Sequence, residues 1–133
     1  MTTPPLSLKA VLIDQDRVLL LLNGRGQWDL PGGRPEPGEN HRKALQREVR
    51  EETGLNVMVS NLVDEHVFEV LPGQFVQIAA YGCLLRGAAE VELSEEHQES
   101  LWVPLDELQD GVDVAGHRLP PGYLQAIRNA AGF

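Results

Sequence analysis

The sequence predicts one domain of the α/β (α+β) class, a sandwich in which helices cover a mixed β-sheet. Its length of 133 residues is typical of a single domain, so we expect the domain to span residues 1–133. The shares of apolar residues (42%) and charged residues (23%) are those of a globular protein. Several short runs rich in Val, Ile, Phe and Tyr accompany two segments of helical character, which together favour this architecture.

The first predicted elements form a hairpin. Leu8–Ile13 and Val18–Leu22 are apolar runs of strand length. The polar residues Asp14–Arg17 between them predict a tight turn. After a loop at Asn23–Gln27, we expect a short extended segment at Trp28–Leu30.

A helix is predicted in the middle of the chain. Pro31–Gly33 and the prolines that follow predict irregular backbone. From His41 to Thr53 the chain contains neither Gly nor Pro. Asn40 suits the N-cap, and Gly54 suits the residue that closes a helix at its C-terminus.

Strands dominate the next thirty residues. Asn56–Val59, Glu65–Leu71 and Gln74–Leu85 are rich in strand-forming residues, and Pro72-Gly73 predicts the turn between the last two. Further on, Leu101–Val103 is a predicted short strand.

The C-terminal part is predicted to be helical. Pro104 favours the start of a helical turn that runs through Leu108. A last helix is expected to begin with Pro121 at its first position, because Leu124, Ile127 and Ala131 follow at helical spacing.

Charge and hydropathy narrow the classes of partner. Eleven basic and twenty acidic residues give a net charge of −9, which argues against binding of long nucleic acid. A small phosphorylated substrate remains compatible, because a divalent cation can invert the local field. The longest apolar run, Val18–Leu22, is too short to cross a membrane, and the N-terminus lacks the pattern of a signal peptide. Cys83 is the only cysteine, so we expect no internal disulfide and a cytoplasmic location.

The predicted middle helix carries a cluster of acids. At about 100° per residue, Glu48, Glu51 and Glu52 fall within an arc of roughly 100°. Leu45 and Val49 form the neighbouring apolar stripe, which is expected to pack inward.

Three carboxylates so close together repel one another. Basic neighbours such as Arg47 and Arg50 could neutralise them on an ordinary solvated helix, or a divalent cation could do so. The residue types alone leave both readings open.

The wider spacing favours the cation. The segment resembles the Nudix box, G-x5-E-x7-R-E-U-x-E-E-x-G-U, where U is a bulky aliphatic residue. It matches at every defined position: Gly33, Glu39, Arg47-Glu48-Val49, Glu51-Glu52 and Gly54-Leu55. The preceding stretch Trp28–Gly32 also resembles the approach to that box.

The resemblance implies an activity and a cofactor. Nudix hydrolases cleave a nucleoside diphosphate linked to another moiety, using Mg²⁺ or Mn²⁺, and their fold is a mixed sheet between helices. Carboxylate oxygens are the ligands that these hard cations prefer. By the family's pattern Glu48 and Glu52 bind metal, Glu51 binds or stabilises a second cation, and the Gly32 carbonyl is a further ligand. Arg47 orients the carboxylates through ion pairs.

Other residues receive roles from the same resemblance. Glu39 packs against the box and can reach a metal through water. The general base differs between members of the family, so Glu48 and a glutamate outside the box both stay open. The outside glutamate lies six residues before a tryptophan in many members, which favours Glu96 before Trp102. Glu95 and Glu99 compete with it, with solvent exposure as the alternative.

The loop before the helix supplies candidate substrate contacts. Gly33, with Gly32, lets the backbone approach the cation and phosphates. Arg25 and Arg34 are candidates for phosphate contact, with plain solvation as the alternative. Trp28 is a candidate for lining the pocket.

Several residues are expected to serve structure. Phe75 and Tyr81 could stack on a base, but core packing is the favoured reading. Trp102 and Cys83 are also expected in the core. The four histidines lack the spacing of metal ligands and are interpreted as surface or incidental residues: His41, His66, His97 and His117.

Three functions from different classes compete at this point. The favoured one is Mg²⁺-dependent hydrolysis of a small nucleotide, such as a nucleoside triphosphate, with ADP-ribose or a nucleotide sugar as the alternative substrate. A non-catalytic nucleotide sensor is disfavoured by the intact Glu48, Glu51 and Glu52. An enzyme acting on RNA ends is disfavoured by the net charge. The resemblance leaves a monomer or a homodimer open.

Overall fold

A mixed β-sheet forms the centre of the structure, a computed structural model that describes residues 3–108 and 113–132. Seven strands join in this sheet, with the order β3-β2-β1-β6-β5, while β4 pairs with β1 and β7 pairs with β2. β1 and β6 run parallel, and β5 and β6 run antiparallel. The strands are β1 (Leu6–Asp14), β2 (Arg17–Leu22), β3 (Trp28–Asp29), β4 (Gly32–Gly33), β5 (Asn56–Leu71), β6 (Gln74–Arg86) and β7 (Glu99–Pro104).

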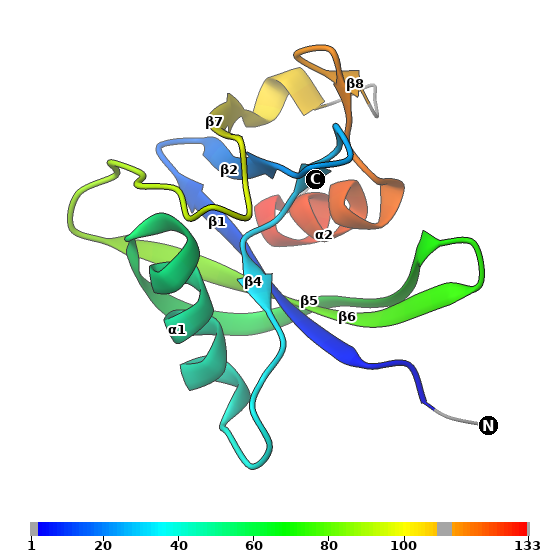
Figure 1. Ribbon diagram of the computed structural model, residues 1–133. Coiled ribbons are helices and arrows are strands. Elements are labelled where there is room, and N and C mark those ends of the chain that lie inside the picture. The colour runs from blue at the N-terminus through cyan, green and yellow to red at the C-terminus, as the bar shows by residue number, and fades with distance from the viewer. Residues whose placement is uncertain (1–2, 109–112, 133) are drawn as a thin grey trace.

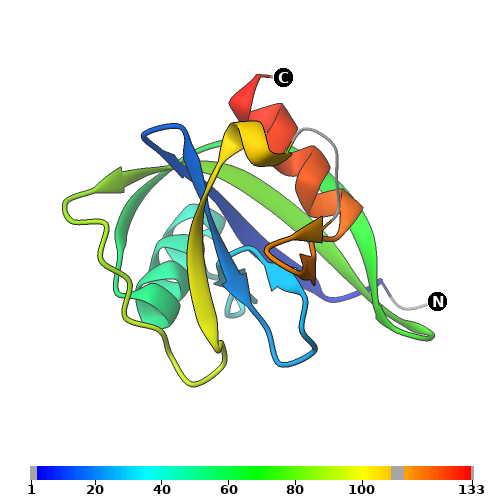
Figure 2. The same cartoon turned by 90° about the horizontal axis from the view of Figure 1, so that it is seen from above.

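Two helices cover opposite faces of this sheet. Figures 1 and 2 show α1 (His41–Thr53) on one face and α2 (Pro121–Ala131) on the other. Side chains alternate along β1 between two separate hydrophobic cores, as the twofold repeat of a strand requires. Leu8 and Leu12 pack on the side of α1, whereas Val11 packs on the side of α2. The predicted sandwich of a mixed sheet between helices is confirmed.

The hairpin at the N-terminus forms as predicted. β1 and β2 pair in antiparallel fashion, with Asp14 opposite Arg17. The two residues between them, Gln15 and Asp16, have φ values of 51° and 60°. Positive φ at both positions is the geometry of a two-residue hairpin turn.

The boundaries of α1 also match the prediction. The side chain of Asn40 accepts a hydrogen bond from the Lys43 amide, and Gly54 closes the helix with φ of 73°. Leu45 and Val49 are fully buried against the sheet. This packing fixes the rotation of α1 and therefore the direction in which its glutamates point.

The strands differ from the prediction in extent. Asn56–Val59 and Glu65–Leu71 were expected as two strands, but β5 is one strand of 16 residues. It spans the gap because its register against β6 shifts between Val59 and Leu62 and again before Asp64. Pro31–Gly33, expected to be irregular, contains the short strand β4.

Two further elements lie near the C-terminus. Leu105–Leu108 forms the predicted helical turn, as a 3₁₀ helix. A small hairpin of β8 (Asp113–Val114) and β9 (His117–Arg118) was not predicted, because two-residue strands leave no periodic pattern. α2 begins at Pro121, as predicted.

The residues that were expected in the core differ in their exposure. Tyr81 and Cys83 are buried, as predicted, and burial raises the pKa of the Cys83 thiol to about 12. Trp102 packs at the margin of the core on the α1 side, where its indole N–H donates to the Ala89 carbonyl. The prediction for Phe75 is wrong, since it is 45% exposed near the tip of the β5–β6 hairpin. Figure 1 shows that this tip projects beyond both helices.

Neither helix in the described residues combines the length and the hydropathy that a membrane span requires.

Candidate active site

Arg47 is the centre of an ion-pair cluster on α1. Its guanidinium forms two hydrogen bonds with the Glu39 carboxylate, at 2.9 and 2.8 Å. It also contacts Glu48 at 3.0 Å and Glu51 at 3.2 Å. These contacts support the predicted orienting role of Arg47. Arg50 takes no part in them and binds the side chain of Asn56 instead.

The same cluster affects the titration of its members. The hydrogen bonds from Arg47, with a further one from the backbone, lower the pKa of Glu39 to about 2. The pKa of Arg47 is raised above its usual value, chiefly by its hydrogen bonds to Glu39. The carboxylates of Glu39, Glu48 and Glu51 are therefore held around the guanidinium of Arg47, whose positive charge offsets their mutual repulsion.

Glu52, one turn after Glu48 on α1, is held by a different set of contacts. Its side chain is buried, and its Oε1 atom accepts a 2.6 Å hydrogen bond from the Gly32 amide. Burial raises the pKa of Glu52 to about 7, against the opposing effects of this hydrogen bond and of the nearby Lys9 charge. Burial disfavours the charged form of a carboxylate, and a cation close to it favours that form.

Gly32 and Gly33 of β4 lie in close contact with β1 and with a side chain of α1. Gly32 has φ of 152°, and a Cβ atom there would overlap the backbone carbonyl of Leu8. A Cβ atom on Gly33 would overlap the carboxylate of Glu48. Gly32 is therefore required by its contact with the neighbouring backbone, whereas a side chain at Gly33 would displace the Glu48 carboxylate.

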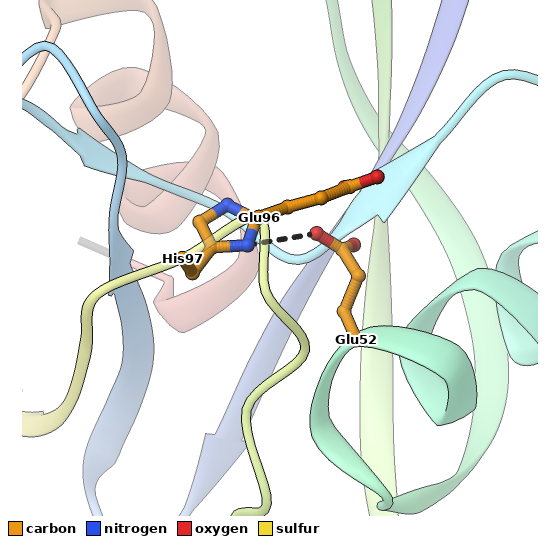
Figure 3. Close-up of side chains that lie close together, drawn as sticks. All are labelled: Glu52, Glu96 and His97. Atoms are coloured by element: carbon orange, nitrogen blue, oxygen red, sulfur yellow. Dashed lines mark ion pairs between the residues drawn. The ribbon is translucent and has the colours of Figure 1, made fainter.

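Glu96 lies beside Glu52. The segment that carries it is tied down at both ends, because the Ser94 amide donates to the Glu52 carbonyl and the Gln98 amide donates to the Leu22 carbonyl. Carboxylate oxygens of Glu52 and Glu96 and a ring nitrogen of His97 lie within 4.8 Å of one another. Figure 3 shows Glu52 reaching in from α1 and the other two side chains from this loop.

A buried ion pair lies behind this group. Lys9 of β1 and Asp29 of β3 are 2.9 Å apart, and both side chains are largely buried. Burial opposes both charges, but their mutual attraction prevails and lowers the pKa of Asp29 to about 2 while raising that of Lys9. His97 contacts Glu52 at 3.2 Å and approaches Asp29 to 3.8 Å. Burial lowers the pKa of His97, yet the neighbouring Asp29 and Glu52 outweigh it and the pKa rises.

The predicted loop residues lie in different surroundings. Arg25 and Arg34 are exposed, as are Glu95 and Glu99. Trp28 is 2% exposed, and its indole N–H donates to the Val114 carbonyl at 2.7 Å. Its contact with substrate stays a prediction, and its burial leaves little ring surface for a nucleotide base.

Lys9, Asp29 and His97 were missed from the sequence. The interpretation of His97 as a surface or incidental residue is wrong, because its side chain is 6% exposed and contacts Glu52. A signal existed for Lys9, which is the one charged residue in the apolar run Leu8–Ile13. Asp29 is likewise flanked by the apolar Trp28 and Leu30. For His97 the sequence offered no pattern, since its partners lie far away along the chain.

The model of the NUDIX domain matches residues 3–120. The chain belongs to the Nudix family. Its solved relatives in this family agree with the fold: a NUDIX hydrolase from Nitrosomonas europaea has a TM-score of 0.79 at 25% identity, over 98% of this chain and 90% of that one. The MutT protein from Methanosarcina mazei Go1 gives 0.76 at 26% identity, over 99% and 97%.

Curated relatives extend the comparison to sequence. This Nudix chain is 32% identical over 105 residues to the CTP pyrophosphohydrolase of Escherichia coli (strain K12), covering 74% of this chain and 75% of that protein. It is 39% identical over 104 residues to a human 8-oxo-dGDP phosphatase, covering 73% of this chain. It spans only 31% of that human protein, and 29% of an octanoyltransferase from Myxococcus xanthus to which it is 35% identical.

Proposed function

We propose that this Nudix protein hydrolyses a phosphoanhydride bond of a small nucleotide by attack of water on phosphorus, with Mg²⁺ as cofactor. One observation carries the proposal. The carboxylates of Glu52 and Glu96 converge beside Gly32, at the end of a helix whose other glutamates, Glu48 and Glu51, are held by Arg47.

The donor set fits a hard divalent cation. Oxygen ligands favour Mg²⁺, with Mn²⁺ as the alternative. Glu48, Glu52 and the Gly32 carbonyl would hold the cation, and Glu51, which is 58% exposed, would serve a second one. The buried Glu52, with its raised pKa of about 7, is the residue that gains most from such a charge. When bound, the cation supplies positive charge to the phosphates and lowers the pKa of a water molecule.

The side chains around the cation site have separate proposed roles. Arg47 orients Glu48 and Glu51 through its ion pairs. Glu96 is exposed next to Glu52, where its carboxylate can accept the proton that the attacking water loses. Glu48 is the alternative general base. Gly33 gives the backbone room beside Glu48, and Arg25 remains a candidate phosphate contact from its exposed loop.

A nucleoside triphosphate is the substrate class that we favour. One relative is named a CTP pyrophosphohydrolase, another a nucleoside triphosphatase, and two from Mycobacterium tuberculosis are named putative 8-oxo-dGTP diphosphatases. The products would be a nucleoside monophosphate and pyrophosphate. The net charge of −9 disfavours long nucleic acid as a partner. We expect the protein to act in the cytoplasm as a monomer or a homodimer.

A release assay over a nucleotide panel tests the proposal. Nucleoside triphosphates, nucleoside diphosphates, ADP-ribose and nucleotide sugars would each be incubated with the protein in Mg²⁺, in Mn²⁺ and in excess EDTA. We expect a nucleoside monophosphate from at least one triphosphate in Mg²⁺ and none in EDTA. Preferred cleavage of ADP-ribose or a nucleotide sugar would show that this compound, and not a nucleoside triphosphate, represents the substrate class. Binding without cleavage across the panel would favour a sensor, and full activity in EDTA would contradict the metal.

A further inference from the structure

Five groups at the candidate metal site and behind it form one closed chain of contacts, here called the buried polar network: Gly32, Glu52, His97, Asp29 and Lys9. The Gly32 amide donates to Glu52 at 2.6 Å, Glu52 contacts His97 at 3.2 Å, and His97 lies 3.8 Å from Asp29. Asp29 pairs with Lys9 at 2.9 Å. Lys9 is the cross-strand partner of Gly32 between β1 and β4, which closes the chain.

The buried polar network joins four separate parts of the fold. Lys9 belongs to β1, Asp29 to β3, Glu52 to α1, and His97 to the loop that precedes β7. Each of these side chains is at least four-fifths buried. Removing two charges from water costs several kcal/mol per ion, so apolar residues would serve stability at least as well here. His97, which lies next to both Asp29 and Glu52, supplies another role for the pair.

We propose that His97 is a positioning residue that holds Glu52 and places Glu96, and that the Asp29–Lys9 pair keeps the imidazole in this orientation. The inference rests on the proposed function, because Glu52 and Glu96 matter only if the site binds metal and substrate. Glu96 is adjacent to His97 in the chain, so fixing one side chain fixes the backbone that presents the other.

Direct ligation by His97 is the competing reading, since its ring nitrogen belongs to the group that lies within 4.8 Å of Glu52 and Glu96. The contacts favour positioning. One ring nitrogen, Nδ1, lies 3.2 Å from the Oε2 atom of Glu52 without a hydrogen bond, and the other, Nε2, lies 3.8 Å from the Oδ2 atom of Asp29. Each ring nitrogen therefore has a carboxylate as a close neighbour. Residues that orient metal ligands in this way typically change metal affinity or activity roughly 10–100-fold when they are replaced.

Equilibrium binding of Mn²⁺, followed by electron paramagnetic resonance, tests the proposal. We expect His97→Gln to weaken Mn²⁺ binding roughly tenfold or more and to lower kcat more than it changes KM. The matched control is His41→Gln, because His41 is exposed at the first position of α1. This variant should leave Mn²⁺ binding and kcat unchanged. A melting curve for each variant shows that the protein is folded.

A second variant keeps the test decisive if His97→Gln does not fold. Lys9→Met combined with Asp29→Leu replaces the whole ion pair by apolar side chains of similar size, which is often neutral for stability. It removes the anchor of His97 while leaving His97 and Glu52 in place. We expect it to weaken Mn²⁺ binding about threefold to tenfold, in the same direction as His97→Gln.

Spectroscopy separates positioning from ligation. Electron spin echo modulation of bound Mn²⁺ should show no coupling to a directly coordinated imidazole nitrogen, and such a coupling would overturn the proposal. Wild-type affinity in both the folded His97→Gln variant and the double variant would also overturn it. Glu52→Gln serves as the reference. If Glu52→Gln binds Mn²⁺ like the wild type, the proposed metal site itself is wrong. If Glu52→Gln loses Mn²⁺ binding while His97→Gln keeps it, only the positioning role is rejected.

Discussion

The Gly32 amide donates a 2.6 Å hydrogen bond to the buried carboxylate of Glu52, across 20 residues of sequence. This bond ties the last turn of α1 to β4 and so to the centre of the sheet. Gly32 adopts a φ of 152° and lies closer to the Leu8 backbone than a side chain would allow. The candidate site is thus built on a helix and a strand that this hydrogen bond joins directly.

Gly33→Val should damage the protein far more than Gly24→Val. A Cβ atom at Gly33 overlaps the Glu48 carboxylate, whereas nothing lies within 4 Å of the corresponding position at Gly24. We expect turnover of the Gly33 variant to fall roughly tenfold or more, because the displaced carboxylate is a proposed metal ligand. Turnover and yield of soluble protein measure the effect. Equal and mild losses in both variants would contradict the close contact.

Arg47→Lys tests whether the shape of the guanidinium matters. An ammonium group keeps the charge but cannot form the paired bonds to Glu39 while also reaching Glu48 and Glu51. We expect kcat to fall roughly tenfold, with a melting temperature within a few degrees of the wild type. Arg86→Lys, at the exposed C-terminal end of β6, provides the control. Unchanged kcat in Arg47→Lys would show that charge alone suffices.

The Lys9–Asp29 pair should make stability depend on acid pH. The pKa of Asp29 is about 2 in the folded protein and 3.8 in the unfolded chain, so its contribution is complete above about pH 5 and is lost progressively as the pH falls through 3.8 and below 2. We expect about 2 kcal/mol of the free energy of unfolding to disappear in this range. Denaturant unfolding of the wild type and of the Lys9→Met, Asp29→Leu variant, measured at several pH values, isolates the effect. Parallel pH profiles for the two proteins would contradict it.

Glu96→Gln should lower turnover by roughly one to three decades, because it removes the candidate base but no proposed metal ligand. Glu95→Gln and Glu99→Gln are matched controls, as both residues are exposed in the same segment. We expect their turnover to stay near that of the wild type. If Glu96→Gln keeps wild-type turnover while Glu95→Gln or Glu99→Gln is inactive, the general base is the residue whose variant is inactive. The rest of the proposed site would be unaffected.

Local signals in the sequence were sufficient for several features. The caps Asn40 and Gly54 mark α1 because capping depends on neighbouring backbone groups alone. The spacing from Gly33 to Leu55 identified the family, since its members place these residues on one loop and one helix. The apolar run Leu8–Ile13, followed by a polar turn and a second apolar run, indicated the first hairpin.

Features that depend on contacts distant in sequence were missed. The extension of β5 through Ser60–Asp64 depends on its pairing with β6, including the register shifts, and no local propensity records it. The burial of His97 depends on Asp29 and Glu52, which lie 68 and 45 residues earlier. Phe75 looks like a core residue by type, but the hairpin that carries it extends beyond the helices. In each case tertiary packing decides the outcome.

The turnover of Glu52→Gln in saturating Mg²⁺ tests the central claim most directly. The substitution preserves the shape of the side chain and its hydrogen bond from the Gly32 amide but removes the charge that the cation requires. Glu65→Gln, an exposed substitution on β5, is the control, and melting curves establish that both variants are folded. We predict a loss of roughly three decades or more in kcat for Glu52→Gln, about 4 kcal/mol of transition-state stabilisation, and none for the control. Turnover of a folded Glu52→Gln variant close to that of the wild type would show that α1 is only a charged helix and that the proposed metal site is wrong.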